Sequence, residues 1–248
     1  MPAPAQIGLE PSHETLQIAS WGHLAGFLLF GATMMGLGLV AQHALTVAGA
    51  SPDQLGRHSQ AINIYLGAIL VDWALLYYCW IGVHRRGGNL ETFSGGRWTS
   101  WKGIAVDLVI ALPFWLLLRG TAYCVYWLLG PNDAKTVDSL LPLSLVEVML
   151  WIAFSINAGI CEEMAFRGYA QRQFQALTGS TVVAVLIQGV VFGLFHFYQG
   201  WKSVVVISVV GVMLGVLAAW RRNLHANIIA HAWADVWSGW LKFLVWGW

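Results

Sequence analysis

Long apolar segments recur along almost the whole sequence, and no other feature restricts the possible folds as strongly. We identify seven of them, at residues 22–47, 61–83, 103–129, 143–166, 180–198, 203–220 and 224–245. A helix of about 20 residues crosses the roughly 30 Å hydrocarbon core of a bilayer. Only 10% of the residues are charged, against about 25% in soluble domains. The sequence therefore predicts an all-α polytopic membrane bundle of about seven helices, with a range of six to eight.

The connections between these segments are polar but short, so none of them has room for a soluble domain. Residues 1–20 form a polar N-terminal segment without Lys or Arg. They also lack a small-residue cleavage pattern after an apolar stretch, so they do not resemble a cleaved signal peptide. We predict one transmembrane domain over residues 21–248. Gly189 with Gly193, and Gly211 with Gly215, are small-xxx-small pairs that favour close helix packing.

The distribution of Lys and Arg predicts the orientation in the membrane. If the 84–102 connection faces the cytoplasm, that side holds Arg85, Arg86, Arg97, Lys102, Arg167, Arg172, Arg221 and Arg222. The other side holds Arg57, Lys135, Lys202 and Lys242. This bias predicts a cytoplasmic N-terminus. We expect an integral membrane protein of a bacterial or archaeal plasma membrane.

Charged residues inside a membrane segment are costly and need a reason. The first cluster is Glu162-Glu163-x-x-x-Arg167. On a helix Glu163 and Arg167 are four apart and can pair, whereas Glu162 is rotated by about 100° and has no local partner. The alternative interpretation is a cytoplasmic helix end with solvated charges.

Two further clusters follow in the last third of the chain. One is Phe192-x-x-x-His196, in which the histidine alone is more typical of a helix end at the interface than of a catalyst. The other places Asn227, His231 and Asp235 at intervals of four residues on an apolar, Trp-rich segment. Lipid does not tolerate such a stripe, so it must face the bundle interior or a wet cavity.

A carboxylate, two imidazoles and a further acid on separate helices are the groups of a hydrolytic site. A glutamate can take a proton from water, and histidines can hold that water or stabilise an oxyanion. The same groups can bind zinc. No HExxH motif is present, which excludes a zinc site of the kind built on one helix.

Together the three clusters resemble the CAAX-protease and bacteriocin-processing family of intramembrane endopeptidases, also called the Abi family, which includes the type II CAAX prenyl endopeptidases. The family pattern is Glu-Glu-x-x-x-Arg, then Phe-x-x-x-His, then His-x-x-x-Asn or Asp. The sequence matches it with Glu162, Glu163, Arg167, Phe192, His196, His231 and Asp235. The resemblance covers about residues 143–245.

The resemblance implies a membrane hydrolase that cleaves peptide bonds near the bilayer surface. By this resemblance Glu162 and His196 activate water, and His231 and Asp235 serve the tetrahedral intermediate. Glu163, Arg167 and Phe192 then support the structure of the site without taking part in the chemistry. Where the family has Asn, an ionised Asp235 cannot donate a hydrogen bond. It either stays protonated through burial or fixes the tautomer of His231.

The family is described both as metal-dependent and as metal-free. We expect no cofactor, with zinc on Glu162, His196 and His231 as the alternative. The expected partner is a membrane-associated protein or peptide, such as a CAAX protein, a leader peptide or a sorting signal, and no basic run indicates nucleic acid. The rival hypothesis is a non-catalytic membrane protein of the same fold, acting as an immunity factor, scaffold or transporter. A transporter should show broken helices and related halves, and the sequence shows neither.

Other charged residues receive simpler interpretations. Asp72 and Arg119 lie at comparable depths and are predicted to pair, while Asp107 and Glu147 lie near segment ends and are predicted to be interfacial. One geometric difficulty remains. Glu162 and His196 can meet only if the helix predicted at 143–166 is longer, continuing to about residue 175.

Overall fold

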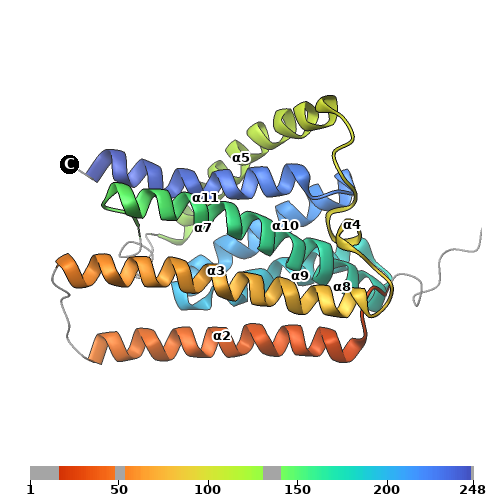
Figure 1. Ribbon diagram of the computed structural model, residues 1–248, viewed down its shortest axis with the longest axis horizontal. Coiled ribbons are helices and arrows are strands. Elements are labelled where there is room, and N and C mark those ends of the chain that lie inside the picture. The colour runs from red at the N-terminus through yellow and green to blue at the C-terminus, as the bar shows by residue number, and fades with distance from the viewer. Residues whose placement is uncertain (1–16, 48–53, 131–140, 247–248) are drawn as a thin grey trace, which may run out of the picture.

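The computed structural model describes residues 17–47, 54–130 and 141–246, and this part of the chain is helical without β-strands (Figure 1). The elements are α2 (Trp21–Val47), α3 (Gln54–His84), α4 (Leu90–Ser94), α5 (Trp101–Leu129), α7 (Leu145–Glu162), the π-helix η1 (Glu163–Ala170), α8 (Gln171–Thr178), α9 (Thr181–Phe195), the 3₁₀ turn η2 (Phe197–Gln199), α10 (Trp201–Arg221) and α11 (His225–Trp246). Most of the polar segment 1–20 and parts of the connections 49–60 and 130–139 lie outside the described residues.

The predicted helical membrane bundle is confirmed. Five helices of the described chain are long and apolar enough to cross a membrane, at residues 21–40, 59–84, 101–129, 145–178 and 201–221. The shorter α9 is also apolar. Whether α9 and α11 cross the membrane stays a prediction. The fourth segment runs from 145 to 178 as α7, η1 and α8 without a break, rather than ending at 166.

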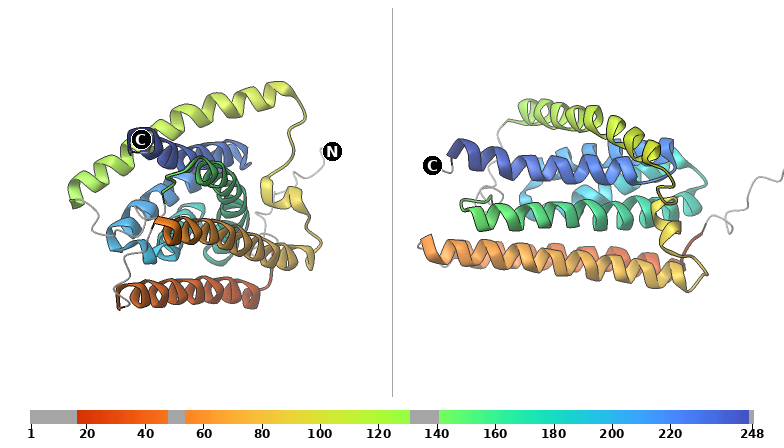
Figure 2. Two further views of the ribbon diagram at one scale, coloured as in Figure 1. Left: turned by 60° about the vertical axis from the view of Figure 1, so that its left-hand side comes forward. Right: turned by 45° about the horizontal axis from the view of Figure 1, so that its top comes forward.

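The long helices are arranged side by side, with α7, η1 and α8 at the centre. Figure 2 shows α5 on the outer side of α11, and α2 and α3 on the opposite side of the bundle. α7 packs against both α3 and α11, while α9 packs against α10. The glycine pairs lie at this last contact, because a Cβ on Gly189 or Gly193 would meet the backbone of α10 at less than 3.0 Å. The predicted close packing is therefore present.

The central position of η1 is visible in its burial. Seven of its eight residues are buried, including the charged pair Glu163 and Arg167. The rings of Phe166 and Tyr169 pack against Phe27 of α2 at centroid distances of 5.4 and 5.5 Å. At Gly168 an added Cβ would lie 2.8 Å from the Phe93 carbonyl oxygen, so α4 closes over this helix. The polar residues of the motif are thus held inside the bundle rather than at a solvated helix end.

The predicted ion pair between Asp72 and Arg119 is wrong. Asp72 Oδ2 accepts a hydrogen bond of 2.8 Å from Asn157 Nδ2. Arg119 Nη1 donates instead to Ser238 Oγ at 3.1 Å. Depth along two helices does not fix which faces meet, and each side chain has a polar neighbour on another helix.

Asp107 and Glu147 lie near the starts of α5 and α7, and both side chains are buried in the bundle rather than solvated. Their interfacial depth in the membrane stays a prediction. Asp107 accepts hydrogen bonds from Trp98 Nε1 at 2.8 Å and from Arg221 Nη2 at 2.9 Å. Glu147 accepts one from the Leu143 N–H at 2.8 Å. Partners from elsewhere in the chain replace water, which allows both carboxylates to be buried.

Candidate active site

The two adjacent glutamates lie where the central helix changes its hydrogen-bonding pattern. Glu162 ends α7, and Glu163 opens the π-helix η1. At the end of η1 the Gln171 N–H donates to the Phe166 carbonyl five residues earlier. Such wider turns inside α-helices are rare and are frequent at functional sites.

Glu163 is fully buried and accepts three hydrogen bonds from two elements. Its Oε1 accepts from Arg167 Nη1 at 2.8 Å and lies 2.7 Å from His231 Nδ1. Its Oε2 accepts from Asn227 Nδ2 at 3.1 Å. Asn227 also donates to the Leu214 carbonyl at 2.7 Å. Glu163 therefore joins η1 to α11 through its contacts with Asn227 and His231.

Arg167 completes this buried network on the other side. Its Nη2 donates to the Gly211 carbonyl of α10 at 3.1 Å. Its guanidinium carbon lies 4.4 Å from the centroid of the Phe192 ring, which gives a cation–π contact. Phe192 of the second motif thus packs on the arginine of the first. The expected Glu163–Arg167 pair is present and is anchored to three helices.

Glu162 points to a different place from Glu163 and lies between two imidazoles. Its Oε1 is 4.0 Å from His196 Nε2, and its Oε2 is 3.7 Å from His231 Nε2. Asp235 Oδ2 lies 3.6 Å from the same His231 nitrogen. These distances exceed those of direct hydrogen bonds. The four predicted catalytic side chains therefore converge without bonding one another.

The hydrogen bonds at Nδ1 fix the orientation of both histidines. His196 Nδ1 lies 2.9 Å from the Phe192 carbonyl oxygen, and a carbonyl can only accept. His231 Nδ1 makes the corresponding bond to the Glu163 carboxylate. We assign the proton to Nδ1 in each ring, which leaves Nε2 facing Glu162. At His231 the carboxylate bound to Nδ1 is Glu163, while Asp235 lies on the Nε2 side.

The length of the central helix explains how Glu162 and His196 meet. Glu162 lies 16 residues before Thr178, where α8 ends (178 − 162), and His196 lies 15 residues after Thr181, where α9 begins (196 − 181). The two helices form a hairpin through Gly179 and Ser180. Nearly equal distances from the turn place the two side chains at one depth.

A cavity of about 640 Å³ contains this group of side chains. It is lined by Glu162, His196, His231 and Asp235 together with many apolar and aromatic residues, among them Trp151 and Phe154. Its size and mixed lining are typical of ligand-binding sites. Arg119 and Tyr198 also line it. Sequence reasoning gave neither of them a role in this cavity, because it paired Arg119 with Asp72, although an intramembrane arginine is itself a signal for a functional site.

Zinc was the alternative cofactor, with Glu162, His196 and His231 as ligands. The donor types suit zinc, and both histidines have the Nδ1 partners that zinc ligands usually have. Donor atoms of a tetrahedral zinc site lie about 3.3 Å apart, but here the separations are 3.7 and 4.0 Å. Within the described residues no group of three or more His, Cys, Asp or Glu is arranged to hold a metal ion. The residues as placed do not fit zinc.

Comparison with known proteins supports the resemblance read from the motifs. Residues 144–237 match the model of the family described as Type II CAAX prenyl endopeptidase Rce1-like, and this range includes every residue of the predicted site. The uncharacterized protein YpbD of Bacillus subtilis (strain 168) is 24% identical over 131 residues. That alignment covers 53% of this chain and 62% of YpbD, less than two thirds of its length. No solved structure matches. The predicted family resemblance is confirmed for this segment.

Proposed function

We propose that this protein is an intramembrane endopeptidase that hydrolyses peptide bonds of a membrane-associated protein or peptide. The observation that carries the proposal is the Glu162 carboxylate between the Nε2 atoms of His196 and His231, at 4.0 and 3.7 Å. This group lies in a cavity large enough for several residues of a substrate. The match of residues 144–237 to the family of type II CAAX prenyl endopeptidases supports the same activity.

In the proposed mechanism Glu162 is the general base. It takes a proton from a water held beside His196 Nε2, and the hydroxide attacks the carbonyl carbon of the scissile bond. The oxyanion that forms is stabilised by His231, which donates from Nε2 when both ring nitrogens are protonated. The Glu163 carboxylate, 2.7 Å from Nδ1, stabilises that cation. When the carbon–nitrogen bond breaks, the proton on Glu162 passes to the leaving amine.

Asp235 is proposed to act beside His231 on the oxyanion. Its Oδ2 lies 3.6 Å from His231 Nε2, and its side chain lines the cavity. Because Glu163 already orients His231, Asp235 is not needed to fix the tautomer. A protonated Asp235 can donate to the oxyanion as the asparagine of the family pattern does.

We propose a metal-free site and predict that protein purified without chelator contains zinc well below one equivalent. The physical reason is the wide donor spacing, together with the commitment of Glu163 to Arg167. Elemental analysis is the measurement, combined with cleavage assays after exhaustive chelation. Stoichiometric zinc, with activity lost on chelation and restored by zinc, would show that Glu162, His196 and His231 are ligands.

We propose that the N-terminus lies in the cytoplasm of a bacterial or archaeal cell. The cavity lining lies in the half of the bundle away from α4, with Gln199 of η2 at that end. In this orientation substrates reach the site from the outer face, which favours leader or exported peptides over cytoplasmic prenylated proteins.

This orientation predicts labelling of a single cysteine at Gln199 by a membrane-impermeant maleimide added to intact cells, in a background without the three native cysteines. A cysteine at Arg97, in the 84–102 connection, is the matched control and should react only after lysis. The reverse pattern would place the cavity on the cytoplasmic side and contradict the proposed route of substrate entry.

The rival function is a non-catalytic membrane protein of the same fold. An immunity factor or scaffold has no need of a carboxylate and two oriented imidazoles in one cavity. Purified protein in liposomes, incubated with a library of membrane-anchored peptides, decides between them. Cleavage that is absent from the Glu162→Gln variant supports the enzyme, whereas binding of peptides without any cleavage supports the rival.

A further inference from the structure

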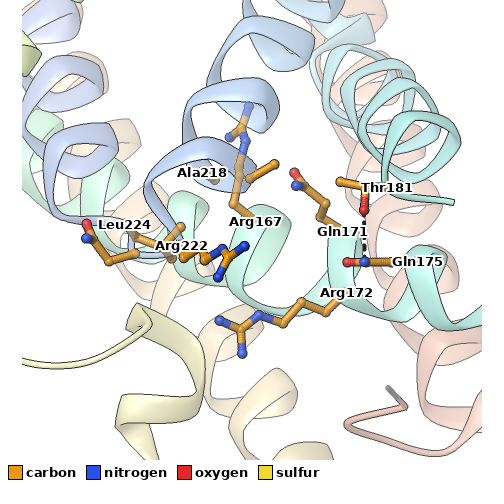
Figure 3. Close-up of a pocket in the computed structure, with 10 residues that line it drawn as sticks. Arg167, Gln171, Arg172, Gln175, Thr181, Ala218, Arg222 and Leu224 are labelled. Atoms are coloured by element: carbon orange, nitrogen blue, oxygen red, sulfur yellow. Dashed lines mark hydrogen bonds between the residues drawn. The ribbon is translucent and has the colours of Figure 1, made fainter. Parts of the chain in front are cut away.

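A second cavity, of about 340 Å³, lies at the end of the bundle that carries α4 and α8 (Figure 3). Its walls come from η1, α8, the first residue of α9, the end of α10 and the turn between α10 and α11. The polar side chains that line it, apart from Arg167 at its inner end, are Gln171, Arg172, Gln175, Thr181, Arg222 and Asn223. It shares no lining residue with the active-site cavity. At its inner end Arg167 pairs with the buried Glu163.

The lining of this cavity is basic and includes no acidic residue. Arg172 donates to the Thr92 carbonyl oxygen. Within the described part of the chain, neither Arg172 nor Arg222 forms an ion pair with a carboxylate. In Figure 3 the two side chains extend towards one another from α8 and from the α10–α11 turn. Two unneutralised guanidinium groups facing one space attract an anion, and arginine suits phosphate in particular.

Two buried polar atoms on the lining have no hydrogen-bond partner. They are Nε of Arg167, a donor, and Oε1 of Gln171, an acceptor. Both residues are more than nine-tenths buried. Neither atom is exposed to the cavity, and Oε1 of Gln171 lies towards Gly215 of α10. The cations that a ligand can reach are therefore the less buried side chains of Arg172 and Arg222.

The backbone at Arg222 also indicates a use for this side chain. Arg222 follows α10 with φ of 56°, a left-handed conformation in which glycine or asparagine is usual. It is the one non-glycine residue of the described chain with positive φ. Arginine at such a position is explained if its guanidinium is required in the cavity.

The cavity lies at the level of a membrane surface. Trp98, Trp101 and Trp220 are exposed at the same end of the bundle, and tryptophan side chains are enriched where a bilayer meets water. Lipid headgroups occupy this level. Basic pockets at the cytoplasmic surface of membrane proteins bind anionic lipid headgroups.

We propose that this cavity binds the headgroup of an anionic phospholipid, such as phosphatidylglycerol. The phosphate lies between the guanidinium groups of Arg172 and Arg222. This binding does not depend on the proposed proteolysis and can be measured without a substrate.

The test is the thermal unfolding midpoint of the full-length protein in a neutral detergent at fixed ionic strength. Short-chain phosphatidylglycerol, short-chain phosphatidylcholine and inorganic phosphate are titrated separately. We expect phosphatidylglycerol alone to raise the midpoint in a saturable way. Equal protection by phosphatidylcholine would overturn the proposal, because that lipid has no net charge. Equal protection by inorganic phosphate would reassign the cavity to a soluble phosphate.

Two variants connect the effect to the cavity. Arg222→Asn removes one cation and suits the positive φ, so the fold should be retained. Arg172→Gln removes the other. Each should weaken the apparent affinity for phosphatidylglycerol about tenfold or more, since a charged hydrogen bond is lost. The matched control is Arg86→Gln, an exposed arginine of the 84–102 connection, which should bind as the parent does. An equal loss in this control, or unchanged binding by Arg222→Asn, would contradict the proposed site.

Discussion

Glu162→Gln should lower the rate of peptide cleavage by about 10²–10⁴-fold, the range for loss of a general base. The amide has the shape of the carboxylate but cannot take a proton from water. Glu162 makes no direct hydrogen bond to His196 or His231, at 4.0 and 3.7 Å, and its side chain is 18% exposed. The variant should therefore fold like the parent. The measurement is turnover of a cleaved peptide, with the unfolding midpoint recorded for each protein.

The matched control for this experiment is Glu91→Gln. Glu91 lies on α4, away from the active-site cavity, and pairs with Arg97 at 2.6 Å in an exposed position. It undergoes the same change of charge and shape, and we expect normal cleavage. If Glu162→Gln cleaves as fast as this control, Glu162 has no part in the chemistry and the proposed mechanism is wrong.

The sequence predicted the long helices well, because apolar segments of about 20 residues have the length of a helix that crosses a membrane. Hydropathy ended the fourth helix too early, at 166, whereas the requirement that Glu162 meets His196 predicted a helix continuing to about residue 175. Residues 171–175 are QRQFQ and resemble a polar connection, yet Gln171 and Gln173 are buried in α8. Gln173 Nε2 donates to the Ala19 carbonyl at 2.9 Å, a partner more than 150 residues away. A hydropathy pattern cannot show that a distant segment will satisfy a polar side chain.

The candidate site shows the same limit. Spacing of four residues predicted the pair of Glu163 with Arg167, because that contact is local to one helix. The hydrogen bonds of Glu163 to Asn227 and His231 depend on how α11 packs, and the sequence does not contain that information. The π-helix that begins at Glu163 also has no residue signature. Local geometry was predictable, whereas contacts between helices came only from the fold.

Glu163→Gln and Arg167→Met should each lower the free energy of unfolding by about 3–5 kcal/mol, the cost of leaving one member of a buried ion pair without its partner. Both side chains are fully buried, and their atoms lie 2.8 Å apart. The Glu163 variant should lose more stability than the Arg167 variant, because the hydrogen bonds of His231 and Asn227 to this carboxylate are also weakened. Denaturant titration in mild detergent, together with yield from membranes, measures the effect.

The double variant Glu163→Gln/Arg167→Met distinguishes a buried pair from two independent contributions. It should be less destabilised than the sum of the single variants, because no unpaired charge is left. The exposed pair Glu91–Arg97 provides the matched control, and its single variants should lose less than about 1 kcal/mol. Single variants of Glu163 and Arg167 as stable as the parent would show that the pair does not support the fold. Cleavage lost without any loss of stability would instead place Glu163 in the chemistry, through the charge that it provides to His231.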